Sequence, residues 1–289
     1  MAAAIYLRRS AVNGLALALS AGATVLGLVF LVWILGVTLQ HGNAAIDWKL
    51  FSKITAYGAE GGLANAIVGS LIMDFLALAI CAPIGVAAGT FLAEYANRTK
   101  LGATIRFLND ILLSAPSIVL GLFVYVIVVL PMSRLTGGAV SFSGLAGAIA
   151  LALIGLPVIV RTTDEMLQLV PGTLREAALS LGVPRWKLTV QVLMRAATSG
   201  IVTGVLLALA RLAGETAPLL FTAFGNNFMT AHPLNKMASV PGAIYQYTND
   251  PNPALHAIAW AGALLIALFV LTLSLATRLF LRRHRSPHD

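Results

Sequence analysis

Six long apolar stretches, separated by shorter polar segments, run through this 289-residue chain. A helix needs roughly 20 residues to cross a hydrocarbon core of about 30 Å, and most of these stretches are long enough. They show no strand-like alternation, so helices are favoured over a membrane barrel. The pattern predicts an all-α, polytopic membrane protein with six transmembrane helices, near residues 15–39, 66–92, 111–130, 145–160, 200–224 and 258–279.

Composition supports the membrane prediction. Hydrophobic residues make up 58% of the chain and charged residues only 10%, whereas a soluble domain carries about 25% charged residues. The first apolar stretch is longer than the ~7–15 residues typical of a secretory signal, so it is expected to be retained. We therefore expect one transmembrane domain over residues 15–280, between tails at 1–14 and 281–289.

The distribution of basic residues predicts the orientation. With the N-terminus in the cytosol, fourteen of the nineteen Lys and Arg residues lie on the cytosolic side and four on the outer side, while Arg211 lies within a span. Basic residues concentrate in the cytosolic loops of membrane proteins. We expect both termini to be cytosolic, and we attribute the net charge of +8 to topology and not to nucleic-acid binding.

A charged, helix-prone segment over residues 171–195 lies between the fourth and fifth predicted spans. Thr173 and Glu176 have the spacing of a capping box, which predicts a helix that starts at this point. Gly182 is a typical helix-stop signal. The segment therefore predicts a short cytosolic helix, which either docks on a partner protein or lies on the lipid headgroups as an amphipathic helix.

The sequence Glu-Ala-Ala in this segment, followed by a glycine, resembles the EAA loop of bacterial ABC-importer permeases. In that family the loop seats in a cleft of the ATP-hydrolysing subunit. Small alanine side chains let a partner approach closely, and a tryptophan supplies a large contact face. The resemblance implies a set of residues that couple the chain to an ATPase: Glu176, Ala177, Ala178, Gly182 and Trp186.

Charged residues also fall within the predicted spans. Arg211 lies about 21 Å along a helix counted from Ala197, and Glu215 follows four residues later on the same helix face. A charge at such depth is costly unless it is paired or faces water. The two residues form either a structural ion pair or a site where the guanidinium meets a passing oxyanion, with the carboxylate limiting how tightly it is held. Asp74 in the second span is expected to be paired or to face water.

Several phrases of the chain resemble the PstA-type permease subunits of bacterial phosphate ABC importers. The most specific is Ala210-Arg-Leu-Ala-Gly-Glu-Thr-Ala-Pro-Leu-Leu-Phe-Thr222, and others lie at 61–67, 83–86, 94–95, 116–121 and 156–163. The resemblance implies a type I ABC-importer permease fold in the bacterial cytoplasmic (inner) membrane. It implies import of inorganic phosphate by alternating access, along a path that includes Arg211, Glu215 and Arg161. Arg161 also suits a topology anchor, since it sits at the inner end of the fourth span.

The same resemblance implies partners. These are a dimer of ATP-binding subunits, a second homologous permease subunit that forms a heterodimer, and a phosphate-binding protein on the outer side, all working in membrane lipid. Alternatives remain: another oxyanion such as molybdate or sulfate, a homodimer, or a membrane scaffold without transport. Residues 192–195 read Val-Leu-Met-Arg and lack the proline that many permeases carry there.

Motifs for catalysis are not found in the sequence. It has no G-x-x-x-x-G-K-[ST], so ATP hydrolysis would have to come from a separate subunit. No Gly-x-Ser-x-Gly or His-Glu-x-x-His is present either, and the five histidines lack metal-ligand spacing. We therefore expect a transporter subunit that is not itself an enzyme, with no catalytic residues, metal or cofactor.

Overall fold

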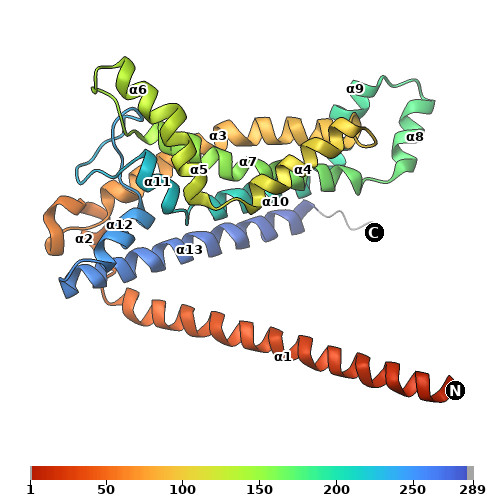
Figure 1. Ribbon diagram of the computed structural model, residues 1–289, viewed down its shortest axis with the longest axis horizontal. Coiled ribbons are helices and arrows are strands. Elements are labelled where there is room, and N and C mark those ends of the chain that lie inside the picture. The colour runs from red at the N-terminus through yellow and green to blue at the C-terminus, as the bar shows by residue number, and fades with distance from the viewer. Residues whose placement is uncertain (1, 285–289) are drawn as a thin grey trace.

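The computed structural model describes residues 2–284, and within them the chain is built from helices without a strand (Figure 1). Six stretches are long and apolar enough to cross a membrane, which confirms the predicted number of spans. They are formed by α1 (Ala2–Asn43), α3 (Ala64–Glu94), α5 (Ser117–Val124) with η2 (Tyr125–Val129) and α6 (Leu130–Leu135), α7 (Gly144–Gln168), α9 (Arg185–Lys187) with η3 (Leu188–Leu193) and α10 (Met194–Leu212), and α13 (Pro253–His284). The shorter elements are α2 (Trp48–Ser52), η1 (Thr55–Glu60), α4 (Lys100–Ser114), α8 (Gly172–Ser180), α11 (Ala217–Thr222) and α12 (Val240–Thr248).

The first and last helices extend beyond the predicted spans. Helix α1 begins at Ala2, so residues 2–14 of the expected tail continue the first transmembrane helix. Helix α13 continues to His284, and residues 285–289 lie outside the described residues. Helix α1 diverges from the bundle and meets α13 at one end (Figure 1), where the ring of His41 stacks on Trp260 at 5.3 Å between centroids. Between Leu15 and Leu35, α1 presents large apolar side chains outward, as a membrane-embedded helix does.

Helix α7 forms the centre of the bundle, and α3 packs along it. A Cβ added at Gly85 of α3 would lie 2.8 Å from a methyl carbon of Ile159, and one added at Gly89 would lie 2.6 Å from the Cβ of Thr163. These distances leave no room for a side chain on α3. Glycine therefore lets the two backbones approach closely, as small residues do at helix contacts in membranes.

The fifth span packs against α7 through a second pair of glycines. A side chain at Gly200 would collide with Met166, and one at Gly204 would collide with Thr162. The sequence predicts a packing face from the four-residue spacing of these glycines, and the structure confirms it. Helix α7 is thus held between α3 and α10 by glycine contacts from both helices.

Two predicted spans have wrong boundaries because the helix breaks within them. The predicted span over 111–130 joins α4 to α5, but Ala115 is extended, with ψ of 136°, as favoured before a proline. The predicted span over 200–224 is also interrupted, since α10 ends at Leu212 and α11 begins at Ala217. Arg211 and Glu215 therefore do not share one helix face, because the helix ends at Leu212 and residues 213–216 are not helical.

The bundle has two distinct ends. Helices α8 and α9 form one, and α2 and α12 lie at the other (Figure 1). The N-terminal end of α1 and the C-terminal end of α13 point toward the α8 end (Figure 1). The structure thus agrees with the predicted placement of both chain ends on the same side as the 171–195 segment. The assignment of that side to the cytosol stays a prediction.

Candidate functional site

Arg211 and Glu215 form an ion pair across the break between α10 and α11. The distance from Arg211 Nε to Glu215 Oε1 is 3.8 Å, which is too long for a hydrogen bond. Among the described residues, the Arg211 guanidinium has no hydrogen-bond partner, and its side chain is 41% exposed. Because a guanidinium carries five N–H donors, Arg211 can bind an anion without first losing a protein hydrogen bond.

The pair lies near the middle of the membrane-spanning region. Leu212, next to Arg211, packs against Gly155 of α7. Gly155 is eleven residues from the first residue of α7, or about 17 Å at 1.5 Å per residue, which is close to the middle of that helix. The break in the helix therefore places irregular backbone and an arginine at mid-span, an arrangement that membrane proteins tolerate where the irregular backbone is buried or lines a cavity.

Arg161 lies on α7, away from this pair. Its Nε donates to Glu165 Oε1 at 2.8 Å, its Nη1 donates to Asp110 Oδ1 at 3.4 Å, and its side chain is 55% exposed. The neighbouring Thr162 packs on Gly204, seven residues before Arg211, so Arg161 lies about 10 Å nearer the α8 end. The structure thus does not bring the three predicted path residues together. The two arginines lie at different depths in the membrane.

Arg161 lines a charged cavity of about 380 Å³ between α3, α4 and α7. A second arginine closes one side of it: Arg106 donates from Nε to Asp164 Oδ2 at 2.6 Å and from Nη2 to Asp164 Oδ1 at 3.0 Å. These bonds raise the pKa of Arg106 and hold α4 on α7. Sequence reasoning counted Arg106 only as a topology signal. The remaining lining is mostly polar: Leu92, Asn97, Asn109, Asp110, Val160, Glu165 and Gln168.

The predicted docking segment forms a helix, α8, with a well-defined C-terminus. Gly182 has φ of +74°, its N–H donates to Leu179 O, and Val183 N–H donates to Ala178 O. These two bonds define a Schellman motif, in which glycine takes the left-handed position. The predicted capping box at Thr173 is wrong: the N-cap is Pro171, which makes no side-chain cap, because the helix already begins at Gly172.

The docking residues named from the sequence form the surface of this segment. Glu176 and Ala177 are exposed, and the Trp186 side chain is 59% exposed, with the Lys187 ammonium 5.5 Å from its ring centroid. Ala178 is half-buried because it packs under the turn at Val183. The segment thus presents a mixed apolar and charged surface, typical of a protein interface.

Arg175 fixes α8 to the transmembrane bundle, a role that sequence reasoning missed. Its Nη2 donates to Glu94 Oε1 at 2.8 Å and to Leu167 O at 2.7 Å, and its Nη1 donates to Val170 O at 2.6 Å. Glu94 ends α3, and the two carbonyls belong to the end of α7 and the turn after it. One side chain therefore ties the docking helix to both central helices of the bundle.

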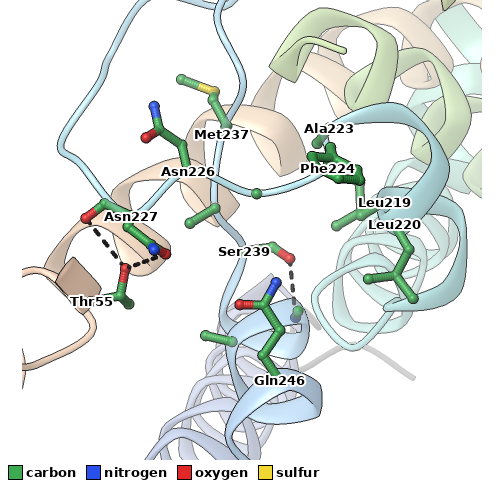
Figure 2. Close-up of a pocket in the computed structure, with 14 residues that line it drawn as sticks. Thr55, Leu219, Leu220, Ala223, Phe224, Asn226, Asn227, Met237, Ser239 and Gln246 are labelled. Atoms are coloured by element: carbon green, nitrogen blue, oxygen red, sulfur yellow. Dashed lines mark hydrogen bonds between the residues drawn. The ribbon is translucent and has the colours of Figure 1, made fainter. Parts of the chain in front are cut away.

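A small pocket with both polar and apolar lining residues lies at the α12 end, between η1, α11 and α12 (Figure 2). Thr55 Oγ1 lies 3.4 Å from both the backbone oxygen and the side-chain oxygen of Asn227, and the buried Asn65 donates to Thr55 Oγ1 and to Asn226 O. These bonds hold the segment before α12 against η1 and α3. The pocket volume of about 20 Å³ suits one water molecule and not a tetrahedral oxyanion.

Comparison with known proteins gives consistent matches. The family model described as "Binding-protein-dependent transport system inner membrane component" matches residues 85–286. The chain is 52% identical to "Phosphate transport system permease protein PstA" of Xylella fastidiosa, over 98% of this chain and 97% of that one. It is 46% identical to the protein of that name from Yersinia pestis, over 94% and 91%. In structure it is similar to the MetNI methionine ABC transporter in inward-facing conformations, with a TM-score of 0.60 and 21% identity over 76% of this chain and 95% of that one.

Proposed function

Because the chain belongs to the family of binding-protein-dependent transport system inner membrane components, we propose that it is the permease subunit of an ATP-driven importer of inorganic phosphate. Relatives with about half of their residues identical, matched over nearly their full length, carry the name of phosphate permeases. The type I fold and the six spans suit this role. Molybdate and sulfate are not favoured, because these relatives are named for phosphate.

The chain needs partners to perform this transport. Arg161 and Arg211 are exposed at membrane depth in the single chain, and such charges require water or another protein surface. A second, homologous permease subunit that faces them across a water-filled path meets this requirement. The exposed surface of α8 and Trp186 suits a pair of ATPase subunits, which puts the α8 end and both termini in the cytosol. A phosphate-binding protein then docks at the α12 end.

Arg211 would act as the binding group at the middle of the path. Its free N–H donors replace part of the hydration shell of phosphate, while Glu215 at 3.8 Å competes for the guanidinium and repels the anion. A cation balanced by a carboxylate therefore binds the anion without trapping it. Arg161, about 10 Å nearer the α8 end and balanced by Glu165 and Asp110, offers a second contact of the same kind.

The observation that carries this proposal is the mid-span Arg211 with no hydrogen-bond partner among the described residues. The test is uptake of labelled phosphate by cells that lack their own importer and express the full set of subunits. Arg211→Gln is expected to abolish uptake at an unchanged membrane level, whereas Arg134→Gln, an exposed arginine at the end of the third span, is expected to preserve it. Undiminished uptake in the Arg211 variant would refute the role of this side chain, and competition by unlabelled sulfate or molybdate would refute the choice of phosphate.

A further inference from the structure

A second cavity within the membrane bundle has no part in the proposed path. It lies between α3 and α13, with α2, α12 and the residue after α10 closing its sides, and its volume is about 200 Å³. Eight of its ten lining residues are apolar, and Ser70 and Asp74 are the two polar ones, four residues apart on α3. The apolar lining residues are Phe51, Ile67, Leu71, Ala213, Val240, Leu265, Ile266 and Phe269.

Asp74 is buried and unpartnered in this cavity. Only 5% of the residue is exposed, and no described residue forms a hydrogen bond or ion pair with its carboxyl group. Ser70 lies one turn before Asp74 on α3, but no hydrogen bond joins its hydroxyl to the Asp74 carboxyl group; its Oγ accepts a hydrogen bond from the backbone N–H of Val240 at 2.9 Å. Helices in membranes rarely hold a carboxyl group in this state, since an intramembrane acid usually finds a cation or water.

No nearby charge compensates Asp74. The surfaces that α2, α12 and α13 turn toward it consist of Phe51, Val240, Leu265, Ile266 and Phe269, none of which titrates. Lys49 of α2 and Lys53, which follows this helix, do not line the cavity. Arg211 and Glu215 are each two residues from Ala213 in the chain, but neither lines the cavity, and the two form an ion pair with each other. The residues that line the cavity therefore offer an ionised carboxylate no cation, and the Ser70 hydroxyl is the one hydrogen-bond donor among their side chains.

Asp74 also lies well inside the membrane. It is ten residues from the first residue of α3, about 15 Å along the helix, at the level of Ala213 and hence of the Arg211 site. An isolated carboxylate at such a place is strongly disfavoured, and uptake of a proton removes its charge. From the burial, the apolar lining and the lack of a partner, we propose that Asp74 is a proton-binding site, held as the neutral carboxylic acid within the bilayer.

The neutral form of Asp74 determines which molecules this cavity can bind. A neutral carboxyl group presents one O–H donor to a space that is otherwise apolar, so the cavity suits a small uncharged apolar molecule with a hydrogen-bond acceptor. Carbodiimides with apolar substituents are of this class and react with carboxylic acids in apolar surroundings. The acid proton moves to a carbodiimide nitrogen, the carboxyl oxygen bonds to the central carbon, and the resulting O-acylisourea rearranges to a stable N-acylurea without loss of atoms.

The experiment treats the assembled importer in membranes with dicyclohexylcarbodiimide and maps the adduct by mass spectrometry of peptides. We expect an adduct on Asp74 at neutral pH, with a yield that falls at least several-fold as the pH is raised. Glu215 in the same sample is the internal control, because it lies 3.8 Å from the Arg211 guanidinium and outside this cavity, and we expect no adduct there. Asp74→Asn should lose the adduct, and Ile266→Trp, which fills the cavity but keeps the acid, should reduce its yield.

Two results would overturn the proposal. The first is an Asp74 that stays unmodified at neutral and at acidic pH, in importer that is active before treatment. This result would show that the carboxyl group is kept ionised, for example by a cation of the second permease subunit. An adduct whose yield neither falls as the pH is raised nor changes in the Ile266→Trp variant would show that the reaction does not depend on a protonated acid in this cavity. Neither readout uses phosphate, so failure here is separable from failure of the proposed function.

Discussion

Replacement of Arg175 directly tests how α8 is mechanically coupled to the transmembrane helices. Replacement by glutamine removes three hydrogen bonds, to Glu94, Leu167 and Val170, and leaves a Glu94 side chain that is only 11% exposed without its cation. Breaking a fully buried ion pair costs about 3–5 kcal/mol. Because the Arg175 side chain is 26% exposed, solvation by water offsets part of this cost. We therefore expect the free energy that attaches α8 to the bundle to fall by about 2–3 kcal/mol.

That loss shifts the equilibrium between attached and detached α8 by about 30- to 150-fold, at 1.4 kcal/mol for each factor of ten. The assay measures phosphate uptake and ATP hydrolysis together in reconstituted importer. We expect Arg175→Gln to lower the number of phosphate ions moved per ATP hydrolysed, because the ATPase subunits still bind α8 but no longer pull on α3 and α7. Hydrogen exchange over residues 172–180 should become faster to a matching extent.

The control is Arg185→Gln, which removes an exposed arginine from the same loop. A second control is the double variant Arg175→Gln with Glu94→Gln, which should recover part of the coupling since no buried charge is left unpaired. The reasoning fails if Arg175→Gln keeps the uptake-to-hydrolysis ratio of Arg185→Gln. It also fails if exchange in α8 is unchanged, since the helix would then be held by other contacts.

Three further predictions concern packing, the charged cavity and docking. Gly89→Leu should force α3 away from α7, lower the free energy of unfolding by about 1–3 kcal/mol or more and lower the thermal midpoint. Gly22→Leu, on the open face of α1, should leave the midpoint unchanged, and equal midpoints for the two variants would contradict the packing argument. Asp164→Asn should lower the free energy of unfolding by about 2–4 kcal/mol, because it breaks the buried ion pair with Arg106. The Asp110 side chain is 60% exposed, so Asp110→Asn should lower it by less than about 1 kcal/mol. Unfolding in denaturant measures both values. Trp186→Ala should weaken binding of the ATPase subunits about tenfold or more in a titration without altering the thermal midpoint, and undiminished binding would exclude Trp186 from the interface.

The sequence was sufficient for features that depend on local composition. Long apolar runs predict six spans because the lipid environment alone imposes their length. The spacing of Gly200 and Gly204 predicted a packing face, because residues without a Cβ let helices approach closely in membranes. Gly182 predicted the end of α8, because glycine readily adopts the positive φ that ends a helix. The Arg211–Glu215 pair was found from spacing, although through a helix that the structure interrupts.

Features that depend on distant segments were not predictable in this way. Arg106 and Asp164 are separated by 58 residues, and Arg175 and Glu94 by 81, so no periodic pattern links them. The Thr173 cap failed because proline and glycine before it already begin the helix, a local competition that the capping pattern ignores. The surroundings of Asp74 come from five separate parts of the chain, which no single sequence window contains.

The central position of α7 has a consequence for how this protein is made. Gly89 and Thr163, which meet at the tightest contact between α3 and α7, are 74 residues apart, so synthesis at about 5–20 residues per second separates them by roughly 4–15 s. During that interval α3 is in the membrane with its glycine face exposed to lipid, because the helix that covers it does not yet exist. The second span must therefore persist as an independent helix until the fourth arrives. Assembly of the core is then a late event, and Gly89 variants should enter the membrane normally and fail only when the helices associate.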